Sequence, residues 1–194
     1  MSDDAPDELE VVGAAGPLDA TVRPPGSKSV TNRALVCAAL AHGTTTLSGV
    51  LRADDTEAMI GCLRDLGVRV ALEERDGTPQ ATVVGVDGRP PAGGAVLDAR
   101  LSGTTSRFIA PVAALVRGTV VLDGADPLRR RPMGDLLDAL AHLGTGIEPL
   151  GEPGHLPVRI TGDGSAGNAG PTTAGSGALA GDVSSQFLSA LLLA

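Results

Sequence analysis

The sequence predicts an α/β protein, of the mixed α+β kind, assembled from a repeated βαβαββ-like unit. Two observations support this prediction. Residues 29–70 and residues 103–147 follow the same plan of helices and strands, and residues 182–194 begin that plan a third time. In both full copies, helix-like apolar periodicity alternates with short strand-like runs bounded by glycine. The matching positions are Arg33 with Arg107, Gly43 with Gly118, Leu47 with Leu122, Gly49 with Gly124, and Leu63 with Leu140.

The first copy opens with a polar turn and an apolar helix that ends at Gly43. A strand is expected at residues 44–50. An amphipathic helix then opens at Asp54, with Glu57 three residues later in a capping-box pattern, and a further strand follows. The apolar stripe of that helix consists of Met59, Leu63 and Leu66.

The second copy repeats these elements, with a strand at residues 119–125 and a loop after it. Pro132 fits the first turn of the amphipathic helix, where its missing N–H is not needed. The stripe of this helix consists of Leu136, Leu137, Leu140 and Leu143. In the third copy, Ser185, Gln186 and Phe187 parallel Ser106, Arg107 and Phe108, and the chain stops after one helix.

The expected organisation follows from these copies. Since repeats need their neighbours to close a core, we expect the chain to be a piece cut from a longer protein. The segments are an acidic disordered tail over residues 1–15, a first unit over 16–98, a second unit over 99–161, a Gly/Ala-rich linker over 162–181, and the truncated start of a third unit over 182–194.

The charge balance limits the partners of the protein. A net charge of −8 argues against a general nucleic-acid surface, which needs a basic face. Five acids among the first ten residues fit neither a secretory signal nor a transit peptide, so a cytoplasmic location is expected. No apolar run reaches the roughly 18 residues of a membrane span, so no membrane partner is expected.

The cysteine and histidine residues predict neither metal nor cofactor binding. Cys37 and Cys62 lie on predicted helices among apolar neighbours, without a nearby CxxC or His partner. Reduced core thiols are the expected state, and a disulfide or a reactive nucleophile are the alternatives. The spacing of the histidines is not that of metal ligands, and they are expected to be structural or exposed: His42, His142 and His155.

Polar clusters stand at the start of the first helix in every copy. A helix N-terminus offers free N–H groups and the positive end of the helix dipole, so it binds anions readily. Ser29 and Arg33 share one face of their helix, and glycine at 26 and 103 would let an anion approach the backbone. The clusters are Ser27-Lys28-Ser29 with Arg33, Ser102-Gly103-Thr104-Thr105 with Arg107, and Ser184-Ser185-Gln186. Equivalent points of a repeat can converge in space, so the three clusters together predict a shared anion site.

Each cluster taken alone has a simpler interpretation. Ser102 or Ser184 would then be a helix cap, and Lys28 or Arg33 a surface charge. The GSKS sequence is not the end of a P-loop, because position 21 is Thr rather than Gly, and a nucleotide kinase is therefore disfavoured.

A run of three arginines precedes the amphipathic helix of the second copy. Arginine is suited to bidentate binding of phosphate or carboxylate. A solvated run explains two of the three, Arg129 and Arg130. Arg131, beside Pro132 and nearest the helix, is the expected ligand.

Four motifs stand in order along residues 17–194: PGSKSVTNRAL, GTTSRF, RRRPMGDLLDAL and DVSSQFLSALLLA. They resemble the N-terminal motifs of the 5-enolpyruvylshikimate-3-phosphate synthase family, or 3-phosphoshikimate 1-carboxyvinyltransferases. The resemblance implies the enolpyruvyl transferase fold, an inside-out α/β barrel of two domains with three βαβαββ units each, here incomplete at the C-terminus. The substrates would lie in the cleft between the domains.

The resemblance also implies a reaction in the shikimate pathway to chorismate and the aromatic amino acids. The enolpyruvyl group of phosphoenolpyruvate passes to the 5-hydroxyl of shikimate 3-phosphate, through a tetrahedral intermediate that loses phosphate. No cofactor and no metal are implied, and the full-length protein would be a monomer. The catalytic acids and bases would lie in the C-terminal domain, so this chain alone is expected to be inactive.

Residue by residue, the resemblance implies a substrate-binding set. Lys28 would contact both substrates, and Ser29 and Arg33 would hold shikimate 3-phosphate. Gly103 and Arg131 would line the phosphoenolpyruvate site, with Thr104 beside it. The last cluster would bind the phosphate of shikimate 3-phosphate through Ser184 and Ser185, while Gln186 would reach toward both ligands.

The chain departs from the family pattern at two places. The turn often written Asn-Ala-Gly-Thr reads Leu101-Ser102-Gly103-Thr104, so any contact from that Asn is lost or replaced. Retention of Gly103 favours sensitivity to the inhibitor glyphosate, whereas Phe108, where many members have Pro, argues against it.

Two other functions remain open from the sequence. The sister enolpyruvyl transferase that acts on UDP-N-acetylglucosamine usually has a loop Cys, but the corresponding loop here, DGADPLRRRP, has none. A non-catalytic fragment, kept for its repeat structure, is the other alternative. Such a scaffold would have no reason to prefer shikimate 3-phosphate over shikimate.

Overall fold

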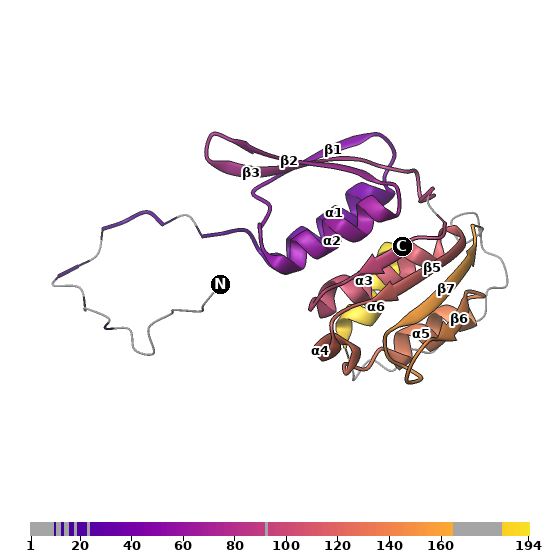
Figure 1. Cartoon of the computed structure of the whole chain (residues 1–194). Coiled ribbons are helices and arrows are strands. Elements are labelled where there is room, and N and C mark those ends of the chain that lie inside the picture. Colours follow the sequence, from indigo (N-terminus) through magenta and orange to yellow (C-terminus); the bar gives the residue numbers. More distant parts are fainter. Residues whose placement is uncertain are drawn as a thin grey trace.

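The computed structural model describes residues 10, 13, 16–17, 19–22, 24–91, 93–164 and 184–194 (Figure 1). Most of the expected acidic tail lies outside the described residues. The expected linker over residues 162–181 is also largely outside the described residues, from residue 165 onward. Its first two residues, 162 and 163, belong to a strand instead.

Among the described residues, two sheets carry the strands. The first is antiparallel, in the order β1-β3-β2, and consists of β1 (Thr44–Ser48), β2 (Arg69–Arg75) and β3 (Thr78–Val84). The second has the order β4-β5-β7-β6 and consists of β4 (Val96–Asp98), β5 (Arg117–Asp123), β6 (Gly146–Pro149) and β7 (Val158–Asp163). Of the strand pairs that the structure describes, only β4–β5 is parallel.

The helices alternate with these strands along the chain. They are α1 (Lys28–Leu40), α2 (Asp54–Asp65), α3 (Gly103–Ala114), α4 (Asp126–Arg129), α5 (Gly134–His142) and α6 (Ser185–Leu193). The mixed α/β class expected from the sequence is therefore confirmed. From β4 onward, with the short α4 as an addition, the order is the expected βαβαββ.

Helices pack against one another between the two sheets (Figure 1). Helix α3 is central, because it contacts α1, α2, α5 and α6 as well as β5 and β7. Every residue of α3 except Arg107 is buried. Sheets outside and helices inside is the reverse of an ordinary α/β barrel, as the sequence resemblance implied.

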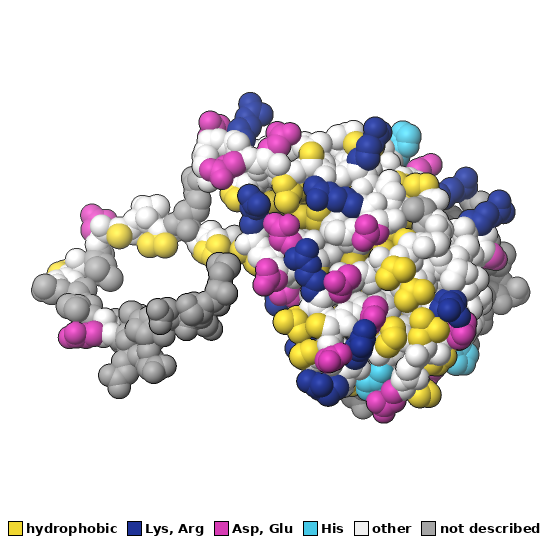
Figure 2. All heavy atoms as spheres, in the orientation of Figure 1, with side chains coloured by type: hydrophobic (Ala, Val, Ile, Leu, Met, Phe, Trp, Pro, Cys, Tyr) yellow, Lys and Arg dark blue, Asp and Glu magenta, His cyan; other side chains and the backbone are white. Residues whose placement is uncertain are grey.

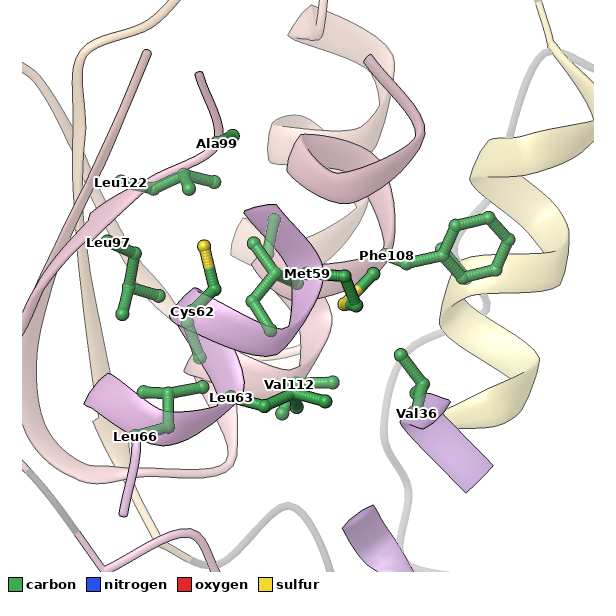
Figure 3. Close-up of a cluster of buried hydrophobic side chains, with 14 of the residues drawn as sticks. Val36, Met59, Cys62, Leu63, Leu66, Leu97, Ala99, Phe108, Val112 and Leu122 are labelled. Atoms are coloured by element: carbon green, nitrogen blue, oxygen red, sulfur yellow. The ribbon is translucent and has the colours of Figure 1, made fainter. Parts of the chain in front are cut away.

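Aliphatic side chains fill the space around α2 and α3. Figure 3 shows side chains of both helices and of β4 and β5 meeting there. With only two aromatic residues in the chain, most of this core is built from small branched side chains and methionine. The fully or almost fully buried members include Met59, Leu63, Leu66, Leu97, Val112 and Leu122.

Local details of two helix starts differ from the expectation. Helix α2 does begin at Asp54, but its capping group is Thr56 rather than Glu57: the Thr56 hydroxyl accepts a hydrogen bond from the Ala53 N–H at 3.0 Å. Pro132 does not lie in the first turn of α5, which begins at Gly134. The expected loop before it contains the short helix α4 instead.

The two cysteines differ in environment. Cys62 lies in the core, as expected, and both thiols are free. The expectation that Cys37 is a core residue was wrong, because its side chain is exposed. Helix α1 buries one face, including Leu35 and Val36, and Cys37 falls on the opposite face with Val30, seven residues earlier.

Strand β4 lies within the range expected for the first unit, 16–98. It nevertheless pairs with β5 in the second sheet. We therefore propose that the boundary between the two units lies before Val96.

The outer surface carries mixed charges. On the face shown in Figure 2, Lys and Arg side chains are interspersed with Asp and Glu side chains. Among the described residues, no helix is long and apolar enough to cross a membrane.

Candidate anion site at the helix starts

The three polar clusters form the starts of α1, α3 and α6, at equivalent positions of the repeat. Each start is capped by a serine hydroxyl that accepts a backbone N–H, so the capping role considered from the sequence is real. The caps are Ser27 with the Val30 N–H at 3.4 Å, Ser102 with the Thr105 N–H at 3.1 Å, and Ser184 with the Gln186 N–H at 3.2 Å.

The first and second clusters are joined through Asp55 of α2. Its carboxylate accepts a 2.6 Å hydrogen bond from the Ser102 hydroxyl and lies 3.3 Å from the Lys28 ammonium. Its backbone carbonyl accepts a hydrogen bond from the Thr105 hydroxyl at 2.9 Å. Sequence reasoning missed Asp55, because an acid in the first turn of a helix has an ordinary explanation in the helix dipole.

The second and third clusters are joined through Arg107 of α3. Its Nη1 donates to the side-chain oxygen of Gln186 at 2.8 Å and to the Ser184 hydroxyl at 3.4 Å. The same guanidinium lies over the ring of Phe187, with its Cζ 5.1 Å from the ring centroid. The sequence included Arg107 in the second cluster of the predicted anion site, although the family resemblance assigned it no contact with a substrate.

Arg33 of α1 turns toward α3. Its guanidinium carbon lies 4.8 Å from the centroid of the Phe108 ring, and its Nη1 donates to the backbone carbonyl of Ser29 at 3.1 Å. Ser29 and Arg33 lie four residues apart within α1, so they share one helix face as predicted, although Arg33 contacts the serine carbonyl and not its hydroxyl.

Arg131 reaches the start of α3 from the segment after α4. A Cβ atom placed on Gly103 would lie only 2.9 Å from Nη1 of Arg131. Arg129 has a different role, since it forms ion pairs with Asp123 at 2.8 Å and Asp126 at 3.2 Å. The Arg129 hydrogen bond lowers the pKa of Asp123. Of Arg129 and Arg131, only Arg131 therefore reaches the start of α3.

Three arginines at the site carry charge that no described carboxylate neutralises, whereas Lys28 is paired with Asp55. Burial lowers the pKa of Arg107, and the nearby charge of Arg131 lowers it further. Among the described residues, no carboxylate forms an ion pair with Arg33, Arg107 or Arg131. Like charges held close without a carboxylate between them favour the binding of an anion.

The remaining expected residues lie at the same helix starts. Thr104 is buried in the first turn of α3, and Ser185 is exposed at the first position of α6. The idea that Gly26 leaves room for an anion was wrong. A Cβ there would lie 2.3 Å from the Gly49 carbonyl oxygen, so the backbone of the neighbouring turn occupies that space.

Comparison with known proteins places the chain in a family. The family model described as EPSP synthase (3-phosphoshikimate 1-carboxyvinyltransferase) matches residues 12–194. The chain belongs to the EPSP synthase family. The resemblance noted in the sequence is thus confirmed.

Individual EPSP synthases show how much of the family the chain covers. A 3-phosphoshikimate 1-carboxyvinyltransferase of Rhizobium etli is 41% identical over 186 residues, which are 96% of this chain and 41% of that protein. The corresponding protein of Bordetella pertussis is 46% identical over 170 residues, 88% of this chain and 36% of that protein. The solved EPSP synthase from Acinetobacter baumannii has a TM-score of 0.69 at 30% identity, over 87% of this chain and 36% of its own.

The chain therefore spans about two fifths of the length of these curated relatives. Its structural likeness to a solved EPSP synthase confirms the enolpyruvyl transferase fold expected from the motifs.

Proposed function

We propose that this chain forms the N-terminal part of an enzyme site that transfers the enolpyruvyl group of phosphoenolpyruvate to the 5-hydroxyl of shikimate 3-phosphate. The observation that carries the proposal is the set of three arginines, Arg33, Arg107 and Arg131, without described carboxylate partners at linked helix starts. Membership of the EPSP synthase family supports the choice of these two anions.

Two substrates of like charge repel each other unless the protein supplies positive charge. Guanidinium groups and capped helix starts supply it here, and they hold the reacting groups together without having to reorganise during the reaction. In the proposed assignment, Lys28, Ser29, Arg33, Ser184 and Ser185 contact shikimate 3-phosphate, Gly103, Thr104 and Arg131 contact phosphoenolpyruvate, and Lys28 and Gln186 reach both.

Addition of the 5-hydroxyl to phosphoenolpyruvate requires one proton to leave that hydroxyl and one to enter the methylene carbon. Loss of the same carbon's proton and of phosphate then restores the double bond in the product. We assign none of these three proton transfers to a residue of this chain, and we place the acids and bases in the remainder of the protein. The full-length protein is proposed to act as a cytoplasmic monomer.

Calorimetric titration of the chain with shikimate 3-phosphate tests the proposal. Binding is expected to be tighter than that of shikimate, and Arg33→Ala is expected to weaken it about 10- to 150-fold, because a hydrogen bond to a charged group contributes roughly 1.5–3 kcal/mol. Arg159→Ala is the matched control, since Arg159 pairs with Glu148 on the outer sheet.

Two other outcomes would replace the proposal. Preference for UDP-N-acetylglucosamine over shikimate 3-phosphate would indicate the sister transferase. Equal binding of shikimate and shikimate 3-phosphate would indicate a fragment without this site.

A further inference from the structure

The only two aromatic residues of the chain occupy the same position of the repeat. Phe108 follows Arg107 in the second copy, and Phe187 follows Gln186 in the third. Both rings are buried, with 0% and 1% of their surface exposed. A core otherwise made of aliphatic side chains therefore uses aromatic rings only beside the helix starts.

Each ring lies against the arginine of the preceding copy. Phe108 packs under Arg33 at 4.8 Å, and Phe187 packs under Arg107 at 5.1 Å. In Figure 3 the Phe108 ring lies apart from the Cys62 and Leu66 side chains, on the side of α6. The two contacts thus repeat one geometry between successive units.

Only the second copy carries both the arginine and the ring, Arg107 and Phe108. The third copy has Gln186 at the arginine position, and the first copy has Ala34 at the ring position. A cyclic arrangement of three copies would bring these two positions together. In such an arrangement Gln186, which has no guanidinium, would face Ala34, which has no ring.

We propose that Phe108 and Phe187 are positioning residues, which orient the guanidinium groups of Arg33 and Arg107 toward an anion at the helix starts. The proposal deepens the function proposed above and rests on it for the identity of the anion. The chemical class recognised is a phosphate-bearing small molecule.

A ring suits this role better than a carboxylate does. The face of an aromatic ring attracts a cation, but it neither neutralises the charge nor occupies the N–H donors at the guanidinium edge. The other partners of both arginines are also neutral: the Ser29 carbonyl for Arg33, and the Gln186 and Ser184 side chains for Arg107. Both guanidinium groups are therefore held in place while their full charge remains available.

A double-mutant cycle with inorganic phosphate as the probe tests this role. Phosphate binding to the chain is followed by NMR titration for wild type, Phe108→Leu, Arg33→Ala and the double variant. Phe108→Leu is expected to weaken phosphate binding about 2- to 30-fold, the range of cation–π contacts. The same change in the Arg33→Ala background is expected to have no further effect, because the ring acts only through Arg33.

Ile109→Val is the matched control, because Ile109 is the next residue of α3, is fully buried and has no ring that could form a cation–π contact. It is expected to leave phosphate binding unchanged. The Arg33 side-chain NH resonance should also lose its ring-current shift in Phe108→Leu and keep it in Ile109→Val. Phe187→Leu with Arg107→Ala forms the parallel cycle.

Three results would overturn the positioning role. The first is an equal loss of phosphate affinity from Phe108→Leu in the wild-type and Arg33→Ala backgrounds. The second is a loss of phosphate affinity in Ile109→Val as large as in Phe108→Leu. The third is no phosphate binding by the wild type. Failure of the proposed function looks different: the phosphate cycle would show coupling, but shikimate 3-phosphate would bind no better than shikimate.

Discussion

Substitution of Gly103 by alanine tests whether Arg131 and the start of α3 form one binding site. The added Cβ would lie 2.9 Å from Nη1 of Arg131, whereas non-bonded heavy atoms pack best at about 3.5–4.0 Å. The guanidinium must therefore move by roughly 0.6–1.1 Å. Arg131 is exposed, so its flexible end can move at little cost to folding.

We expect Gly103→Ala to weaken ligand binding much more than it lowers the free energy of unfolding. Gly103 occupies the first position of α3, where alanine is a better helix former, so the free energy of unfolding should change by less than about 1 kcal/mol. Displacement of a guanidinium that binds an anion forfeits up to roughly 1.5–3 kcal/mol. Phosphoenolpyruvate should therefore bind up to about 10- to 150-fold more weakly, with shikimate 3-phosphate much less affected.

Calorimetry with phosphoenolpyruvate at saturating shikimate 3-phosphate, together with urea unfolding, measures both effects. Gly61→Ala is the control, because Gly61 lies within α2 and a Cβ there meets no atom within 4 Å. Wild-type affinity in Gly103→Ala would refute the reasoning. A fall of more than about 2 kcal/mol in unfolding free energy would also refute it, because the damage would then lie in the fold.

Three further predictions concern the stability and chemistry of the chain. Ser102→Ala removes the cap of α3 and the hydrogen bond to Asp55, and urea unfolding should show a loss of about 1–3 kcal/mol. The Arg129 hydrogen bond lowers the pKa of Asp123 in the folded chain. The ionised Asp123 carboxylate therefore stabilises the fold at pH values above its usual pKa of about 3.9, and this stabilisation is lost as the pH falls through the lowered pKa. The difference in unfolding free energy between wild type and Asp123→Asn should therefore shrink at acid pH, and a constant difference would contradict this. Burial raises the pKa of Cys62 to about 12, so iodoacetamide at neutral pH should label only Cys37 in the native chain and both thiols after denaturation, as intact mass will show.

Local sequence patterns predicted the long helices better than the short helix α4 and the pairing of strand β4. The apolar helix before Gly43 and the helix opening at Asp54 were found where expected, because periodicity and start signals are properties of a few adjacent residues. The short helix α4 was missed, since four residues carry no period. The sequence also did not predict that β4 belongs to the second sheet, because strand pairing joins residues far apart in the chain.

The same distinction applies to the candidate site. The repeat located the three polar clusters, and motif order identified the family. Neither could show that Asp55 joins Lys28 to Ser102, or that Arg107 joins the second cluster to the third.

By itself, the sequence determined the class of fold, the repeated plan, the position of the helix starts and the excess of cations at them. Only the tertiary structure decided which cations stay without a carboxylate, which side of α1 leaves Cys37 exposed, and which rings lie under Arg33 and Arg107. The physical reason is that helix formation depends on neighbours three and four residues apart. Pairing of charges and rings depends on how separate helices pack, and a one-dimensional pattern does not contain that geometry.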